Sequence, residues 1–228
     1  MLVNSRRIGT GKELAALRDS LLVGFMAMTG CRPGEALALR WRDIVGKVSI
    51  EGALSGDRIV DRTKTETDRV TPLLRTLARD LAALRERSGD GPDDYVFRTP
   101  AGEHWIETDW RNYRSRHFVS ALQRVEASWK NWRAGLGDSA AVRESVAGLS
   151  KTRPYDLGRH THSALMLASG MSLQRLARIQ GHSIRVLDET YSEELAEFEG
   201  RTERINPEQE IARARALVWA ERDPSGGR

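Results

Sequence analysis

The chain has 228 residues, enough for one full-sized domain, and its 39% hydrophobic and 30% charged residues are ordinary for a globular protein. No stretch approaches the roughly 18 uninterrupted apolar residues that span a bilayer, and the first residues lack the apolar core of a signal peptide. The single cysteine, Cys31, excludes an intramolecular disulfide and disfavours a cysteine-based zinc site. The formal net charge of +4 favours an anionic partner. These totals predict a cytoplasmic protein with no membrane partner.

Two amphipathic helices are predicted before residue 90. Each carries apolar residues at steps of three and four, which mark one helical face. The first should end at Gly30 and the second near Ser88 and Gly89, because glycine commonly follows the last helical residue. The apolar stripes consist of Leu14, Leu17, Leu21, Phe25 and Met28 in the first helix, and Leu74, Leu77, Leu81 and Leu84 in the second.

A small antiparallel sheet or hairpin is predicted between these helices, over residues 47–72. Val48 and Ile50 alternate with polar residues, and Gly52 and Gly56 supply turns. A further short extended piece is expected at residues 95–97.

The second half of the chain is predicted to be helical. A helix is expected over 106–130, with core contacts from Trp110, Tyr113, Phe118, Leu122 and Val125. Residues 133–151 are rich in Gly, Ser and Ala and should form a loop. Ser172 can cap a short helix that Gly181 closes. Asn206 and Pro207 suit the start of a last helix over 208–221, followed by a disordered tip.

Three stretches contain the candidate functional residues. The first runs from Thr29 to Leu39 and includes Arg32, the second from Asp156 to Thr161 and includes Arg159, and the third from Gly181-His182 to Tyr191. His182 follows Arg159 by 23 positions, and Tyr191 follows His182 by nine. This series resembles the tyrosine recombinase (phage integrase) family over roughly residues 12–200. The resemblance implies the catalytic-domain fold of that family, mainly α with a small antiparallel β-sheet.

The resemblance also implies a reaction on double-stranded DNA. Tyr191 would attack a phosphodiester and keep the 3′-phosphate as a phosphotyrosyl ester. Arg32 and Arg159 match the two arginines that clamp the phosphate, and each is expected to contribute about 3 kcal/mol, as oxyanion donors do. His182 matches a histidine that hydrogen-bonds the phosphate, and Lys64 a lysine that protonates the leaving 5′-oxygen. No metal or cofactor is expected.

Several of these residues also have ordinary structural interpretations. Arg32 is otherwise a surface arginine, Tyr191 a half-buried helix tyrosine, and Lys64 a solvated lysine at a hairpin tip, with Lys47 a less favoured substitute. Glu35 either orients the site or interacts with a helix dipole. His160, directly after Arg159, is assigned to packing or hydrogen bonding.

The chain departs from the family pattern in two places. Asp156 occupies a position that is commonly histidine, with Tyr155 one step earlier; either Asp156 points away from the phosphate or Tyr155 takes its role. An aspartate can also accept a proton, so Asp156 stays among the catalytic candidates. The chain also begins only 31 residues before Arg32, which leaves no room for the usual core-binding domain. We therefore expect a catalytic domain over residues 1–205, without a core-binding domain, and a C-terminal helix with a disordered tip over 206–228.

The predicted function is site-specific DNA recombination, as integration or excision. The alternative is a catalytically impaired DNA-binding remnant or regulator that acts with a full-length partner. Besides DNA, the expected partners are a second copy of this chain, contacted through the C-terminal helix, and a core-binding domain or full-length recombinase in trans. That helix can otherwise pack on its own domain; its apolar residues are Ile211, Ala214, Leu217 and Val218.

Overall fold

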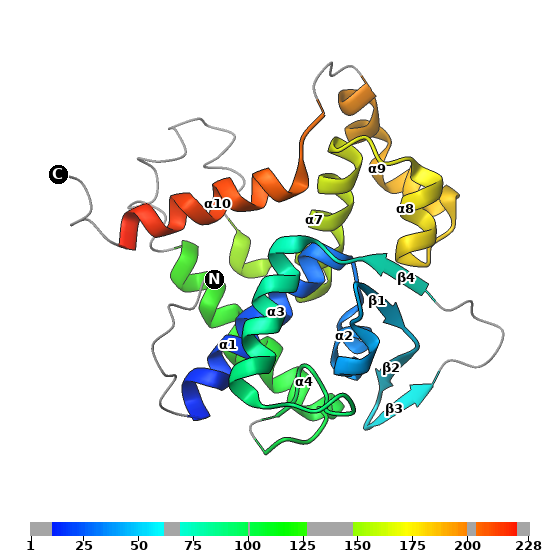
Figure 1. Ribbon diagram of the computed structural model, residues 1–228. Helices are drawn as coiled ribbons and strands as arrows, with labels where there is room; N and C mark the ends of the chain where they lie inside the picture. The colour runs from blue at the N-terminus through cyan, green and yellow to red at the C-terminus, as the bar shows by residue number, and fades with distance from the viewer. Residues whose placement is uncertain (1–10, 62–68, 100, 127–147, 200–203, 223–228) are drawn as a thin grey trace.

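A computed structural model describes residues 11–61, 69–99, 101–126, 148–199 and 204–222, with the side chains of some residues near the ends of these ranges left out (Figure 1). The elements of the first half are α1 (Gly11–Thr29), α2 (Pro33–Ala38), a 3-10 turn (Trp41–Asp43), β1 (Lys47–Ile50), β2 (Gly52–Ser55), β3 (Arg58–Asp61), β4 (Arg69–Pro72) and α3 (Arg75–Ser88). Those of the second half are α4 (Glu107–Asn112), a π-helical segment (Tyr113–Phe118), a 3-10 turn (Leu149–Lys151), α7 (Pro154–Ala168), α8 (Leu173–Gln180), α9 (Ile184–Glu199) and α10 (Pro207–Arg222).

The predicted sheet region is antiparallel, but it forms two separate two-stranded sheets. β1 pairs with β4, and β2 pairs with β3. Val48 and Ile50 of β1 are buried, as their alternation predicts. On β4 the pattern is reversed, because Arg69 and Thr71 are buried while Val70 is 43% exposed. A strand that directs an arginine inward needs a buried partner for it, and that partner belongs to the candidate site.

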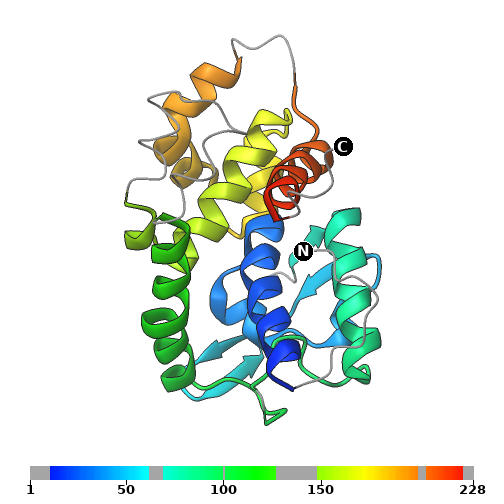
Figure 2. The ribbon, with the colours of Figure 1, turned by 90° about the vertical axis from the view of Figure 1, so that its left-hand side faces the viewer.

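The main core is built around α1, which lies between α7, α3 and the green helix that begins with α4 (Figures 1 and 2). Leu17, Leu21 and Phe25 of the predicted stripe are buried. α7 lies close to α1 at Gly158, where an added Cβ would come within 2.8 Å of the Met26 Cβ. This close approach fixes α7, and with it Arg159, against the central helix α1.

The helix predicted over 106–130 is present but interrupted. α4 continues through the π-helical segment into further α-helix up to residue 126, beyond which the structure describes nothing until 148. Four of the predicted core residues, Trp110, Tyr113, Phe118 and Leu122, are buried. The prediction was wrong for Val125, which is 36% exposed. A cavity of about 550 Å³ separates this end of the helix from α1, so packing here is incomplete.

The remaining predicted elements are largely confirmed. Tyr95 forms a single antiparallel bridge with Arg40, and α3 ends at Gly89 in the left-handed conformation. The hydroxyl of Ser172 accepts a hydrogen bond from the Arg175 N–H and so caps α8. Of the predicted loop over 133–151, only residues 148–151 are described, and they end in a 3-10 turn. The predicted tip at 223–228 lies outside the described residues.

The last helix, α10, lies across α3 of the same chain (Figure 2). The Asn206 side chain accepts hydrogen bonds from two backbone N–H groups of its first turn, as predicted for its cap. Glu208 accepts hydrogen bonds from the backbone N–H groups of Arg75 and Thr76, and Arg215 pairs with Asp80 at 2.5 Å. α10 therefore packs on its own domain through polar contacts of its first turn and of its middle.

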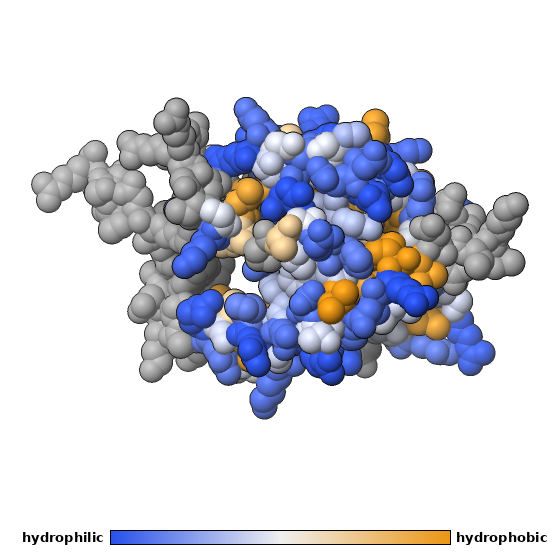
Figure 3. Space-filling model, turned by 90° about the horizontal axis from the view of Figure 1, so that it is seen from below, coloured by the Kyte–Doolittle hydropathy of each residue, from blue (hydrophilic) through white to orange (hydrophobic). Residues whose placement is uncertain are grey.

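The molecular surface is mostly hydrophilic in the view from below, with hydrophobic residues gathered mainly toward the side on which the sheets lie (Figure 3). Among the helices that the structure describes, none has the length and apolar character that crossing a membrane requires.

Candidate active site

Arg32 stands at the junction between α1 and α2. α1 ends before Gly30, whose φ of +68° turns the chain, and Arg32 precedes Pro33 at the start of α2. The Glu35 carboxylate accepts hydrogen bonds from the Arg32 backbone N–H at 2.8 Å and from its Nη1 at 3.3 Å. The Arg32 side chain is 40% exposed. Glu35 thus holds the backbone and the side chain of Arg32 while leaving part of the guanidinium open to a ligand.

Arg69 of β4 joins this junction to the far end of α8. Its guanidinium is buried, pairs with the buried Glu35 carboxylate, and donates a hydrogen bond from Nη1 to the Gln180 carbonyl at 2.7 Å. Next to that carbonyl, Gly181 has a φ of +62°, and a Cβ there would collide with the Arg69 guanidinium. This position therefore requires glycine both for its backbone conformation and for the space that Arg69 occupies.

Arg159 of α7 reaches the same carbonyl from the other side. Its Nη2 donates to the Gln180 oxygen, and its Nη1 lies 3.3 Å from the Tyr155 hydroxyl and 2.8 Å from His182 Nε2. Arg159 is 3% exposed. Two arginines thus converge on the C-terminal carbonyl of α8, where the helix dipole favours positive charge. In the described part of the chain, the buried Arg159 Nε has no hydrogen-bond partner.

His182 follows Gly181 and faces this arginine cluster. Burial, together with the charges of Arg159, Arg32 and Arg69, lowers the pKa of His182 to about 4. The imidazole is therefore neutral near pH 7, and its Nε2 accepts the hydrogen bond from Arg159. A continuous chain of hydrogen bonds and ion pairs connects Arg32 to His182 through Glu35, Arg69, Gln180 and Arg159.

Tyr191 lies where α9 is kinked. Its φ of −121° and ψ of 18° interrupt the helix, and its ring is buried beside apolar residues of α7, α8 and α9. The Tyr191 hydroxyl lies 2.8 Å from His160 Nδ1, and the two rings meet edge to face. His160 is exposed, so it is not a packing residue, but it makes the hydrogen bond that the sequence interpretation also allowed. Its contact with Tyr191 is the main feature of this site that sequence reasoning missed.

Asp156 is bound to its neighbour Arg153 at the start of α7. Arg153 donates hydrogen bonds to both oxygens of Asp156, at 2.6 and 2.9 Å, and these bonds lower the pKa of the carboxyl. Tyr155, one position earlier, instead directs its hydroxyl toward Arg159. The structure thus pairs Asp156 with Arg153 and places the Tyr155 hydroxyl beside Arg159, and the two alternatives raised by the sequence stay predictions.

The other candidates contribute less to this geometry. Lys64 lies outside the described residues, and Lys47 is an exposed residue at the start of β1. Burial raises the pKa of the Cys31 thiol to about 12, so this cysteine is not a nucleophile near neutral pH. Within the described ranges, no group of three or more His, Cys, Asp or Glu side chains is arranged to hold a metal ion.

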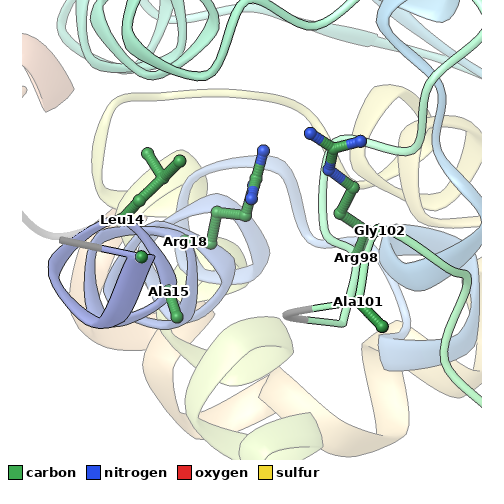
Figure 4. Close-up of a pocket in the computed structure, with 7 residues that line it drawn as sticks. Leu14, Ala15, Arg18, Arg98, Ala101 and Gly102 are labelled. Carbon is green, nitrogen blue, oxygen red and sulfur yellow. The ribbon is translucent and has the colours of Figure 1, made fainter.

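One cavity of the protein lies apart from this cluster. It has a volume of about 290 Å³ and lies between the first turns of α1 and the turn that contains Ala101 and Gly102, with the guanidinium groups of Arg18 and Arg98 facing each other across it (Figure 4). None of its lining residues is a candidate site residue. The candidate site is therefore separate from this cavity.

The sequence is similar to sequences of known proteins. The model of the phage integrase family matches residues 6–196. The defective protein IntQ of Escherichia coli (strain K12) is 29% identical over 174 residues, which are 68% of this chain and 39% of that protein. The chain thus spans about two fifths of the length of this curated relative.

Solved structures of the Tn1549 transposon integrase have a similar fold. A complex of that integrase with circular intermediate DNA gives a TM-score of 0.52 at 16% identity, covering 87% of this chain and 67% of that one. A complex with transposon right end DNA gives 0.51 at 16% identity, covering 98% and 68%. The chain belongs to the phage integrase family and has the tyrosine recombinase catalytic-domain fold, mainly α-helical with small antiparallel sheets.

Proposed function

We propose that this chain cleaves and rejoins DNA at specific sites through a 3′-phosphotyrosyl intermediate on Tyr191. The observation that supports this most is the polar chain from Arg32 to His182, which gathers side chains from α2, β4, α7 and the α8–α9 turn. Placing three arginines around one carbonyl and one carboxylate adds little to the free energy of folding, so stability alone does not explain the array. Such an array suits a ligand with several anionic oxygens, and a phosphodiester of double-stranded DNA is that ligand.

The arginines would act on the transition state. Attack on phosphorus builds negative charge on the non-bridging oxygens, and fixed guanidinium groups stabilise it without reorganising. Arg32 contributes a half-exposed guanidinium, while Arg159 is held rigidly, and its buried Nε has no hydrogen-bond partner among the described residues. The neutral His182 can donate an N–H to a phosphate oxygen while its Nε2 stays bonded to Arg159.

The bonds and protons of the cleavage step give roles to Tyr191 and Lys64. The Tyr191 oxygen forms a bond to phosphorus as the bond to the 5′-oxygen breaks, and the leaving oxygen takes a proton that we assign to Lys64. Rejoining reverses these steps, so the energy of the broken bond is retained in the phosphotyrosyl ester. Asp156, bound to Arg153, would take no direct part in phosphate binding.

Further partners belong to the same proposal. We propose that copies of the chain associate on DNA through α10, whose polar contacts with α3 can be made equally well between two copies. A core-binding domain or a full-length recombinase in trans would supply the second half of a clamp around the duplex. These partners would determine site selection, because phosphate contacts alone carry no sequence information.

The alternative function is a catalytically impaired DNA-binding regulator that acts with a full-length partner. Asp156 in place of the common histidine favours it, as does the similarity to IntQ, whose name calls that protein defective. The five residues Arg32, Lys64, Arg159, His182 and Tyr191, all retained, oppose it.

A covalent-trapping assay separates the two functions. Nicked duplexes with a randomised region are incubated with the protein, and denaturation-resistant complexes are recovered and sequenced to identify a site. Recombinase activity gives an adduct on that site with the wild type and none with Tyr191→Phe. DNA binding without any adduct, alone or with a full-length recombinase present, would support the regulator.

A further inference from the structure

The hydroxyl of Tyr191 needs a proton acceptor if it is to attack phosphorus. An unperturbed tyrosine has a pKa of about 10, so little phenolate forms near pH 7. The distance of 2.8 Å between this hydroxyl and His160 Nδ1 lies within the range over which a general base removes a proton. We propose that His160 is this acceptor, a catalytic assignment that rests on the proposed cleavage by Tyr191.

The neighbouring groups that could accept a proton are engaged elsewhere. His182 Nε2 is bonded to Arg159, and the Tyr155 hydroxyl also faces that arginine. Both oxygens of Asp156 accept hydrogen bonds from Arg153. His160 instead directs a ring nitrogen at the nucleophile, and its exposed side chain can release a proton to water.

Asp156 has a supporting role in this arrangement. It precedes His160 by four positions on α7, so the two side chains lie on one face of the helix, and their charges interact. When the imidazole gains the tyrosine proton, the nearby carboxylate stabilises the resulting positive charge. Among the described residues, Tyr191 on α9 contacts His160 directly, and Asp156 on α7, paired with Arg153, interacts with it through charge. An aspartate at this position therefore favours the protonated imidazole.

Each proton that moves in the cleavage step has a donor and an acceptor. The Tyr191 O–H proton moves to His160 Nδ1 as the oxygen bonds to phosphorus, and the 5′-oxygen leaves with a proton from the general acid. In rejoining, the protonated imidazole returns its proton to the departing Tyr191 oxygen. His160 therefore acts at the tyrosine end of the reaction, and Lys64 at the 5′-oxygen end.

The test compares two substrates in single-turnover cleavage. One is the nicked duplex recovered by covalent trapping, and the other carries a 5′-bridging sulfur at the scissile bond, which leaves without a proton. A variant that lacks the base at Tyr191 cleaves both substrates more slowly, by the same factor. A variant that lacks the general acid cleaves only the oxygen substrate more slowly, because the sulfur leaving group needs no proton. We expect His160→Gln to slow both by about 100-fold, the lower end of the effect of general-base catalysis, with DNA affinity unchanged. Lys64→Ala should slow only the oxygen substrate.

Two further measurements separate chemistry from structure. In His160→Ala, added imidazole should restore part of the rate, and the decline of the wild-type rate at acidic pH should be lost. His117→Gln, a change at another exposed histidine, serves as the matched control and should cleave like the wild type. Thermal melting of His160→Gln should match the wild type, because the side chain is exposed.

The outcomes are distinguishable. A His160→Gln rate within threefold of the wild type would overturn the assignment and leave the proposed function standing. A faster rate would also overturn it, because His160 would then hold Tyr191 in a resting position. Absence of any adduct with the wild type on either substrate would contradict the proposed function itself, and this assignment with it.

Discussion

The ion pair between Glu35 and Arg69 offers a quantitative test of the site's architecture. Both side chains are at least 97% buried, and the pair connects Arg32 to the Gln180 carbonyl. Glu35→Gln preserves the shape of the side chain but removes its charge, so the buried Arg69 guanidinium loses the carboxylate of this pair. Breaking one partner of a buried pair costs about 3–5 kcal/mol of the free energy of unfolding. Arg32 also loses the carboxylate that orients it, so DNA cleavage should fall as well.

Urea denaturation at pH 7.5 measures this cost. Arg42→Ala is the matched control, because its pair with Asp93 is exposed and should contribute at most about 1 kcal/mol. The double variant Glu35→Gln with Arg69→Gln should be less destabilised than the sum of the two single variants, since it leaves no lone buried charge. A Glu35→Gln stability within 1 kcal/mol of the wild type, or additive single effects, would refute the reasoning.

Three further predictions concern histidine burial, the α8–α9 turn and α10. Burial lowers the pKa of His162 to about 4, so the unfolded chain binds more protons between about pH 4 and 6.5, and stability falls as the pH drops through that window. His162→Asn should make the difference in unfolding free energy between pH 7.5 and pH 4.5 smaller by about 3 kcal/mol. The same difference in the variant and in the wild type would contradict this prediction. Gly181→Ala should destabilise the protein more than Gly89→Ala, because both glycines have a positive φ but only a Cβ at position 181 would meet a neighbouring side chain. Of the two variants, only Gly181→Ala should impair cleavage. Arg215→Ala should speed hydrogen exchange in α10 relative to the exposed control Arg213→Ala, and equal exchange would argue against the contact with α3.

Much of the helical framework could be predicted from local pattern. Leucines at helical spacing mark the buried faces of α1 and α3. Gly89 ends α3 and Gly181 ends α8, both in the left-handed conformation. These features depend on residues within a few positions of one another, so sequence alone is sufficient. The motif spacings likewise identify Arg32, Arg159, His182 and Tyr191 as one set by resemblance, although their roles remain predictions.

The connections within the site depend on tertiary structure. Hydrophobicity alone would bury Val70 of β4, yet its neighbour Arg69 points inward because Glu35, 34 positions away, and the Gln180 carbonyl receive it. His160 meets Tyr191 across 31 positions because α9 is kinked at the tyrosine. No local pattern encodes either contact. Val125 was expected in the core because its spacing suits one helical face, but spacing within one helix cannot reveal that the packing between this helix and α1 is incomplete.

The most direct test of the account is the identity of the residue that carries DNA after cleavage. A trapped adduct is digested with nuclease and protease, and the modified peptide is sequenced by mass spectrometry. If Tyr191 is the nucleophile, we expect a nucleotide joined through its 3′-phosphate to Tyr191, and no adduct in Tyr191→Phe. An adduct on any other residue, or one that persists in Tyr191→Phe, would contradict it.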